Sequence, residues 1–285
     1  MGNEIYEKFN SLTDEEFLNL LILADKEAVI EGVQMPGFPD LEFQKNSVGS
    51  RGADDLRLEP FNFTNAVKKY AKQFNGEVCK NTKLLDFGVG WGRMIRFFFK
   101  DIPSENLFGI DTWQLMVDKC NNLLPSGNYS LNPSHPPTEF SDASFDIIIS
   151  YSVFSHLRSD AAKMWIKEFS RILKPNGILV ATTEGVRFLN LIEWLHNNPD
   201  RVGDHHWYEL LYKGFNLPIE EYRERYAAGE FLYAANGGGD ALDNSFYGDA
   251  IVPEKYIKEN FGKHLNLKEF CDNEKMSQAI FVMQK

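Results

Sequence analysis

The segment from Leu84 to Met94, LLDFGVGWGRM, carries three glycines at alternate positions behind an aspartate. Glycine has no Cβ, loses more backbone freedom on folding than any other residue, and weakens a strand or helix that it interrupts. Three glycines so close together therefore indicate a turn that another group must approach closely. A short apolar run, KLLDF, comes immediately before them. We therefore expect the turn to follow a buried strand, where backbone N–H groups can face a ligand.

Four short apolar runs lie between residues 80 and 185, with amphipathic segments between them. The runs KLLDF, NLFGI, FDIIIS and GILVATT are continuous rather than alternating in polarity, which predicts strands buried on both faces. Residues 92–99, 112–123 and 160–173 are predicted to be helices. In the last of these, one face gathers Ala162, Trp165, Ile166, Phe169, Ile172 and Leu173. Strand–helix alternation of this kind predicts an α/β fold with helices on both faces of a parallel sheet.

The segments on either side have a different character. Residues 1–75 are predicted to form a helical N-terminal extension, because Thr13 and Glu16 have capping-box spacing before an apolar run and residues 63–74 form a second helical stretch. The loop between them, MPGFPDLEFQKNSVGSRG, is rich in Gly, Pro and Asn. After residue 186 come aromatic residues and histidines, and then a glycine-rich loop, NGGGDALDNS. Residues 253–260 are a predicted helix, and LNLKEF and SQAIFVMQ are predicted terminal strands.

The amino-acid composition limits the kinds of partner that the chain can bind. The chain has 285 residues, of which 43% are hydrophobic, and this permits one large α/β domain or two small ones. A formal net charge of -11 argues against an extended nucleic-acid surface, since phosphate binding relies on clustered Lys and Arg. Three dispersed cysteines indicate reduced thiols. The polar amino terminus has no signal-peptide pattern, and no apolar stretch is long enough to cross a bilayer. We therefore expect a cytoplasmic protein with no membrane partner.

Two cofactor classes use a glycine turn of this kind, and two residues discriminate between them. A dinucleotide fingerprint, G-x-G-x-x-G, would place its third glycine at the position that Arg93 occupies. Asp86 lies inside the end of the strand, where a carboxylate would repel a pyrophosphate but suits an ammonium group. The observed spacing, D-x-G-x-G-x-G, therefore disfavours NAD.

At these residues the chain resembles the class I S-adenosylmethionine-dependent methyltransferases, whose first motif is a D-x-G-x-G-x-G turn. Three further segments match in order: LFGID, which ends at Asp111, FDIIISYSVFSHL at 145–157, and RILKPNGILVATTEG at 171–185. In the last, Asn176 replaces a family glycine and tolerates turn conformations. The finer resemblance is to bacterial enzymes that modify small molecules, often sugars or natural products.

The resemblance implies a fold and a division of the chain. The fold is a Rossmann-like sheet of seven mostly parallel strands in the order 3-2-1-4-5-7-6. The methyltransferase domain would occupy residues 76–285, with residues 1–75 as a lid. Within the domain, an insertion after the fifth strand, at about 186–250, would recognise the substrate.

The same resemblance assigns residues to the cofactor S-adenosylmethionine (SAM) and its product S-adenosylhomocysteine (SAH). The first aspartate takes the methionine amino group, the glycine backbone approaches the methionine and ribose, and the second aspartate accepts from the ribose hydroxyls. The two residues after it border the adenine, and the last two residues of the set face the sulfonium. In that order the predicted cofactor residues are Asp86, Gly88, Gly90, Gly92, Asp111, Thr112, Trp113, Ser150 and Tyr151.

Methyl transfer depends on positioning and on a base that deprotonates the acceptor hydroxyl. His156 follows the fourth strand, and imidazole is suited to proton abstraction near neutral pH. Glu184 follows the fifth strand and is the second catalytic candidate. The residues alone leave other readings open, since a histidine in such a turn can be a structural donor and a loop carboxylate can simply be solvated.

The insertion carries the predicted acceptor-binding residues, which are His205, His206, Trp207, Tyr208 and Tyr226. Aromatic faces with hydrogen-bonding edges suit sugars or aromatic metabolites, although part of this set could equally cover the end of the sheet. No metal is expected. The acidic positions of metal-dependent O-methyltransferases hold Ser150–Tyr151 and Thr183–Glu184 here. In the glycine-rich loop, Leu242 stands at the third coordinating place of a calcium loop.

The resemblance therefore implies a metal-independent O-methyltransferase that acts on a hydroxyl of a sugar or natural product. N-methylation of a small molecule or peptide, a NAD-binding oxidoreductase and a catalytically silent SAM-binding protein are the alternatives. Methylation of RNA is disfavoured by the acidic charge. The identity of the acceptor and the oligomeric state stay open.

Overall fold

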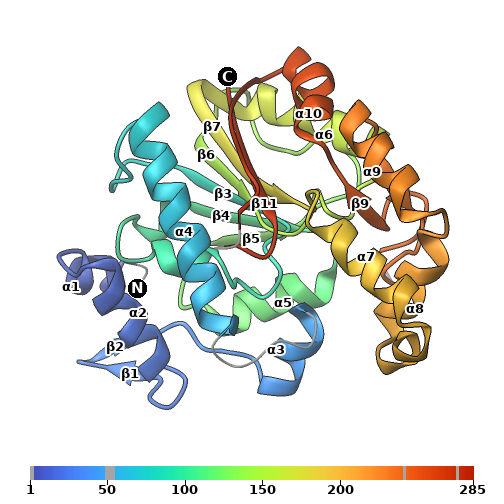
Figure 1. The fold of residues 1–285 in the computed structure, drawn as a ribbon. Coiled ribbons are helices and arrows are strands. Elements are labelled where there is room, and N and C mark those ends of the chain that lie inside the picture. The colour runs from blue at the N-terminus through green and yellow to red at the C-terminus, as the bar shows by residue number, and fades with distance from the viewer. Residues whose placement is uncertain (1–2, 49–54, 240–241, 274–275) are drawn as a thin grey trace. The chain divides into compact units, whose positions relative to one another are not determined.

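The computed structural model describes residues 3–48, 55–239, 242–273 and 276–285 (Figure 1). Two residues of the glycine-rich loop, Asp240 and Ala241, lie outside this set, as do residues 1–2 and 49–54 of the predicted lid. The N-terminal elements are α1 (Glu4–Phe9), α2 (Asp14–Leu23), the strand pair β1 (Val29–Ile30) and β2 (Val33–Gln34), α3 (Leu41–Val48) and α4 (Asp55–Phe74). No helix in the described ranges is both long enough and apolar enough to span a bilayer.

Seven strands form the main sheet: β3 (Leu84–Phe87), β4 (Leu107–Asp111), β5 (Asn128–Leu131), β6 (Phe145–Ser150), β7 (Leu173–Thr183), β10 (Asn266–Cys271) and β11 (Ala279–Gln284). Their order is β10-β11-β7-β6-β3-β4-β5. Numbered along the chain and read from β5, this is 3-2-1-4-5-7-6, so the predicted strand order is confirmed. β3 pairs in parallel with β4 and β6, and β4 with β5, whereas β10 and β11 are antiparallel.

The chain divides into two compact units. The first unit comprises Met1–Pro133, Asp142–Ile149 and Leu173–Ile178, and the second comprises Ser134–Ser141, Ser150–Ile172 and Leu179–Lys285. Each unit is described below by itself. The functional division predicted at residue 75, and the recognition role of residues 186–250, stay predictions.

Continuous apolar strands form the core of the first unit. Leu84 and Leu85 of β3 pair with β4 on one side and with Ile147 and Ile148 of β6 on the other, and all four side chains are fully buried. Burying each such side chain stabilises the fold by about 1.5–3 kcal/mol. The helix after β4, α5 (Gln114–Leu123), confirms the helix predicted at 112–123. The glycine turn therefore starts from a strand that is fixed on both sides.

The helix predicted at 92–99 is wrong as an α-helix, since only a short 3-10 helix, η1 (Ile95–Phe98), follows the turn. A regular α-helix here would use the Ile95 N–H and the carbonyls of Trp91 and Gly92 in backbone hydrogen bonds, but side chains occupy these groups instead. The Ile95 N–H donates to the Asp86 carboxyl group. The Arg96 side chain donates from Nε to the Gly92 carbonyl at 2.8 Å and from a terminal nitrogen to the Trp91 carbonyl at 3.3 Å. These side-chain bonds occupy the groups that a regular α-helix would pair with one another.

The N-terminal elements match their sequence signals, with one addition. Thr13 caps α2, and its hydroxyl and the Glu16 side chain form the predicted capping box. The stretch predicted as a loop contains α3 as well. Asp40 begins that helix, because its Oδ1 accepts from the Phe43 N–H at 2.8 Å.

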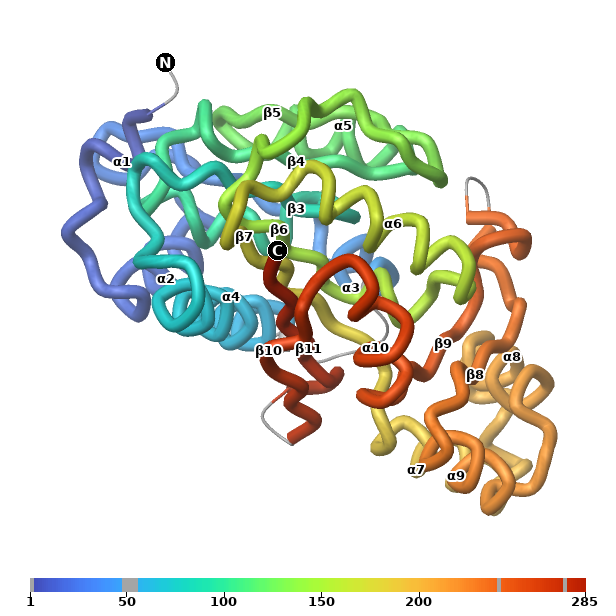
Figure 2. Tube along the Cα trace, turned by 90° about the horizontal axis from the view of Figure 1, so that it is seen from above, coloured from blue at the N-terminus to red at the C-terminus, as the bar shows by residue number. Residues whose placement is uncertain are grey.

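The first α-helix of the second unit is α6 (Ser159–Ile172), whose predicted apolar face is buried. The insertion folds as α7 (Phe188–Asn197), the 3-10 helix η3 (Pro199–Asp204), α8 (His206–Gly214), α9 (Ile219–Ala228) and a hairpin of β8 (Leu232–Ala234) and β9 (Asp249–Ile251). These helices lie together beside β8 (Figures 1 and 2). Buried side chains from α7, α8, α9 and the hairpin form a separate small core. The chain ends with α10 (Glu254–Asn260), the 3-10 helix η4 (Phe261–Lys263), β10 and β11.

Substituting alanine at Gly90 and at Gly92 should destabilise the first unit by different amounts. Both residues have positive φ, +55° and +79°, where a Cβ costs about 1–2 kcal/mol. A Cβ at Gly92 would also lie 2.5 Å from Leu124 Cδ1, whereas at Gly90 it would meet nothing within 4 Å. We therefore expect Gly92→Ala to lose about 1 kcal/mol more than Gly90→Ala in urea unfolding. Equal losses would show that Leu124 moves aside without cost.

Candidate active site

Asp86 is a buried carboxyl group near the end of β3, with a relative exposure of 1%. Burial, followed by repulsion from the Asp111 carboxylate, raises the pKa of Asp86 to about 8, while the Ile95 N–H opposes this shift. Across the part of the chain that the structure describes, Oδ2 of Asp86 finds no hydrogen-bond partner. A buried acceptor without a partner is costly, so this position suits a ligand that brings a cationic hydrogen-bond donor.

The glycine turn follows at once and is held against β4. The N–H groups of Gly88 and Val89 both donate to the Ile110 carbonyl, at 2.9 and 3.1 Å. Gly88, Gly90 and Gly92 all have positive φ, which residues with a Cβ rarely adopt. The space beside Gly90 is open to 4 Å, so a ligand can approach the backbone there.

Asp111 ends β4 and is joined to the turn. Its Oδ2 accepts from the Gly90 N–H and its Oδ1 from the Trp113 N–H, both at 2.9 Å. Burial raises the pKa of this carboxyl group, while the N–H groups of Trp113, Gly90 and Thr112 lower it. Each oxygen keeps a second lone pair, so the carboxylate can also accept from ligand hydroxyls. Thr112 and Trp113 are half-buried beside it.

Two buried arginines support the turn, and neither was predicted to have this role. Arg93 forms an ion pair with Glu59 at 2.6 Å. Arg96 holds the last two carbonyls of the turn, and its guanidinium lies over the rings of Phe38 and Trp91 at 4.2 and 4.7 Å. Burial, followed by repulsion from a neighbouring guanidinium, lowers the pKa of Arg96 to about 9. The close succession of glycines and arginines in GWGRMIR was the available signal.

In the second unit, polar residues follow the end of β6. Ser150 is fully buried, and none of the described residues accepts from or donates to its Oγ. The Tyr151 hydroxyl lies 3.1 Å from the Ser277 Oγ. Ser152 has a φ of +58°, and its N–H donates to the Thr182 Oγ1 at 2.8 Å. The assignments of Ser150 and Tyr151 to the sulfonium stay predictions.

His156 is fixed by a backbone carbonyl. Its Nδ1 lies 2.8 Å from the Gly248 carbonyl oxygen, and its ring stacks on Tyr247 with centroids 4.7 Å apart. Because a carbonyl oxygen only accepts, Nδ1 carries the proton, and Nε2 of the neutral ring is left as the acceptor. His156 is therefore in the tautomer that a base acting through Nε2 requires.

Asp249 stands beside this histidine and was missed at the sequence level. Its Oδ1 lies 3.8 Å from the His156 Nδ1 and accepts from the Trp207 Nε1 at 3.1 Å. Its Oδ2 accepts from the Asn236 Nδ2 at 2.6 Å. The carboxylate is 5% exposed, so it acts on the imidazole with little solvent screening. No sequence spacing links an aspartate in the late insertion to a histidine after β6.

The remaining predicted residues have several different environments. Glu184 is half-buried one residue after β7, and its Oε1 accepts from the Gln278 Nε2 at 2.9 Å. His205 caps α8 by accepting the Trp207 N–H, and His206 is exposed. Trp207, Tyr208 and Tyr226 pack against the core of the insertion. Among the residues described, no three His, Cys, Asp or Glu side chains are grouped so that they could hold a metal ion.

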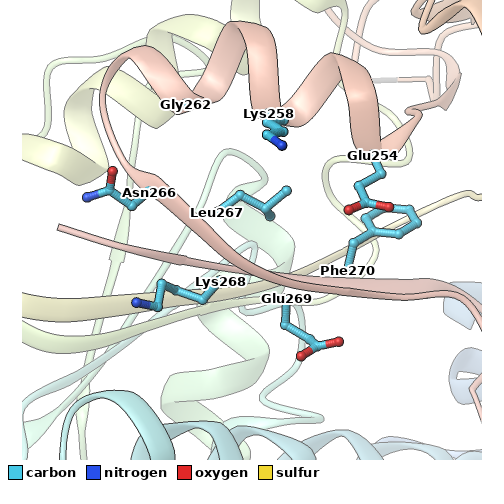
Figure 3. A pocket seen from close by; sticks show the side chains of 8 residues that line it. All are labelled: Glu254, Lys258, Gly262, Asn266, Leu267, Lys268, Glu269 and Phe270. Atoms are coloured by element: carbon cyan, nitrogen blue, oxygen red, sulfur yellow. The ribbon is translucent and has the colours of Figure 1, made fainter.

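A groove of about 430 Å³ lies elsewhere on the second unit, where α10 passes along β10 (Figure 3). It is lined by Glu254, Lys258, Gly262, Asn266, Leu267, Lys268, Glu269 and Phe270. None of the predicted site residues lines it. Its two acidic and two basic side chains give it no net charge that would favour one kind of ligand.

The central segment of the chain matches a known protein family. The family model described as "Methyltransferase domain" matches residues 85–181, which include the glycine turn, the end of β4 and the end of β6. Magnesium protoporphyrin IX methyltransferase from Synechocystis PCC 6803, solved with bound SAH, is similar in structure with a TM-score of 0.53 and 10% identity. That match covers 94% of this chain and 98% of that one.

Two further solved structures have the same fold. A protein from Pyrococcus horikoshii OT3 matches with a TM-score of 0.51 and 16% identity, over 82% of this chain and 92% of its own. An S-adenosylmethionine-dependent methyltransferase from Clostridium acetobutylicum ATCC 824 matches with a TM-score of 0.50 and 14% identity, over 85% and 96%.

The raised pKa of Asp86 predicts a pH-dependent stability. Because the folded protein holds this proton up to about pH 8 and the unfolded chain only to about pH 4, the contribution to stability is full below pH 4. It is lost as the pH rises through 8. In urea unfolding between pH 5 and 8, the wild type should lose up to about 1.4 kcal/mol per pH unit relative to Asp86→Asn. A difference that does not vary with pH would contradict this, and the exposed Asp118→Asn is the matched control.

Proposed function

We propose that the protein is a class I, SAM-dependent methyltransferase that transfers a methyl group to a hydroxyl of a small-molecule acceptor. The match of residues 85–181 to the family model "Methyltransferase domain" and the fold shared with a methyltransferase solved with bound SAH support this proposal. The acceptor class that the aromatic side chains of the insertion suit is a sugar or natural product. The observation that carries the proposal is His156, whose Nδ1 is tied to a carbonyl so that Nε2 is available as a base. The proposed reaction uses no metal.

The residues of the first unit fit the cofactor. The unpartnered Oδ2 of Asp86 matches the methionine amino group, the open face of Gly90 allows close approach, and Asp111 has lone pairs for the ribose hydroxyls. Thr112 and Trp113 are assigned to the adenine. When bound, SAM would supply an activated methyl group on its sulfonium. We assign Ser150 and Tyr151 to its sulfonium side.

The base chemistry is proposed for the second unit. Nε2 of His156 takes the proton of the acceptor hydroxyl, and the ring then becomes an imidazolium. The Asp249 carboxylate, 3.8 Å from Nδ1, stabilises that positive charge, while the Gly248 carbonyl keeps the ring in place. A base of this kind contributes about 10²–10⁴-fold to the rate. An amine acceptor has its own lone pair, so N-methylation would depend less on this base.

Acceptor recognition is proposed for the aromatic side of the insertion. The Trp207 Nε1 donates a hydrogen bond to the Asp249 carboxylate, so this indole links α8 to the aspartate beside His156. Tyr208 and Tyr226 pack nearby on the insertion core, and burial, followed by the charge of Asp272, raises the pKa of Tyr226 to about 12. Tyr226 is therefore a neutral hydrogen-bonding group at physiological pH. We place the protein in the cytoplasm, where its three free cysteines would stay reduced.

Asp111→Ala should weaken SAH binding about tenfold or more, because charge-assisted hydrogen bonds to the ribose would be lost. Isothermal titration calorimetry with SAH measures this affinity, and urea unfolding shows whether the fold is kept. Asp118→Ala, on the exposed face of α5, is the matched control and should bind as the wild type does. Unchanged affinity in Asp111→Ala would contradict the ribose assignment. Binding of NADH without binding of SAH would contradict the choice of cofactor.

His156→Gln should lower methyl transfer about 10²–10⁴-fold and leave SAH affinity unchanged. The assay supplies SAM labelled in its methyl group with a panel of hydroxylated and amino acceptors. Mass spectrometry then identifies the methylated atom. His264→Gln, at an exposed position, is the control. A rate equal to that of the wild type on a hydroxyl acceptor would exclude His156 as the base, and transfer only to nitrogen would replace the proposed acceptor class.

A further inference from the structure

Gln278 is a buried amide immediately before β11, with a relative exposure of 6%. Its Oε1 accepts from the Thr182 hydroxyl at 2.6 Å. Its Nε2 lies 2.9 Å from the Glu184 Oε1, 3.0 Å from the Ser152 Oγ and 3.3 Å from the Ser155 Oγ. One side chain therefore contacts the segments that follow β6 and β7, within the second unit.

The neighbours of the Gln278 amide determine which of its ends is the carbonyl and which is the NH₂ group. The Ser152 N–H donates to the Thr182 Oγ1 at 2.8 Å, so the threonine hydroxyl proton is free to be donated onward. The Gln278 carbonyl oxygen receives it at 2.6 Å, and the other end of the amide must be the NH₂ group because the Glu184 carboxylate beside it only accepts. The NH₂ end is thereby directed to Glu184 and the two serines.

The NH₂ group has two hydrogens and three acceptors within reach. A carboxylate is the strongest of the three acceptors, so one hydrogen goes to Glu184. The serine pair, whose hydroxyl oxygens are 3.3 Å apart, takes the other. Ser152 also has a positive φ of +58°, and a non-glycine residue persists there only when its surroundings hold it. Gln278 and Thr182 supply that support.

We propose that Gln278 is a positioning residue that holds the Glu184 carboxylate ready to accept a hydrogen bond from the methyl acceptor. The inference rests on the proposed function, because it gives Glu184 an acceptor to bind. The acceptor must then offer a hydroxyl or ammonium donor to Glu184. A carboxylate that was merely solvated in a loop would not need a buried amide with a fixed orientation beside it.

The test uses the full-length protein and the acceptor that the labelled-SAM screen returns. Gln278→Leu and Glu184→Gln should each lower kcat/KM for that acceptor about tenfold or more, with the Kd for SAH changed less than twofold. Both substitutions disable the same Gln278–Glu184 pair. The double variant Gln278→Leu with Glu184→Gln should therefore have a kcat/KM no lower than that of either single variant. Multiplied losses, or an unaffected Gln278→Leu, would overturn the proposal. Gln73→Leu, at an exposed position, is the matched control.

Exchanging the two groups separates positioning from pairing alone. In the double variant Gln278→Glu with Glu184→Gln, the amide at 184 can donate to the carboxylate at 278, so the hydrogen bond is restored in the opposite direction. We expect this variant to recover the Tm lost by Gln278→Glu alone, in which two carboxylates face each other, but not its activity. Recovery of activity would overturn the proposal, since pairing would then be sufficient without a carboxylate at position 184.

A structural measurement needs no acceptor and keeps this inference distinct from the proposed function. In a crystal structure of Gln278→Leu with SAH, the Glu184 carboxylate should turn away from its wild-type position. An unchanged Glu184 would overturn the inference even if methyl transfer is found. If Gln278→Leu does not fold, Gln278→Asn serves instead, because its shorter amide cannot reach Thr182 and Glu184 together. A screen without any methylated product would count against the proposed function alone.

Discussion

The hydrogen bond from the Gly90 N–H to Asp111 connects two parallel strands at their carboxyl ends. Parallel pairing of β3 with β4 places the two strand ends side by side, so a turn after one strand can meet a carboxylate after the other. The turn can make this contact only because its glycines adopt positive φ. The carbonyls of Trp91 and Gly92 in the same turn need donors, and Arg96 supplies them from a buried position. The shape of the turn thus depends on a carboxylate that accepts from one of its N–H groups and on a guanidinium that donates to two of its carbonyls.

Apolar runs made most of the sheet predictable, and the missed elements lacked that signal. β3, β4, β6 and the end of β7 were recognised because each carries a continuous apolar run. β5, with the sequence NYSL, carries no apolar run and pairs only with β4, so nothing in its own residues marked it as a strand. Likewise α3 lies in a segment whose Gly and Pro content indicated a loop. The 3-10 geometry of η1 depends on the side chains of Asp86 and Arg96, which local periodicity does not reveal.

The residues of the candidate site also include some that the sequence made predictable and some that it did not. Asp86 and the glycines belong to one short motif, and the family resemblance implied that Asp111, at the end of the next strand, would lie beside them. Asp249 and Gln278 lie far along the chain from the residues that they contact, and only the tertiary fold brings them together. An isolated glutamine before an apolar strand carries no chemical signal of its own. A role for this glutamine can be inferred only from the direction of the hydrogen bonds around it in the folded protein.

The link between Trp207 and Asp249 has a consequence for redesign. Enzymes of modular build are often given new specificities by grafting a loop region from a relative. Here such a graft would replace the carboxylate next to His156 together with the aromatic surface, since Asp249 lies at the far end of that same region. On the proposed mechanism, a chimaera would therefore lose turnover along with its old preference. Libraries that vary the exposed aromatic positions, with the tryptophan–aspartate contact left intact, avoid this loss.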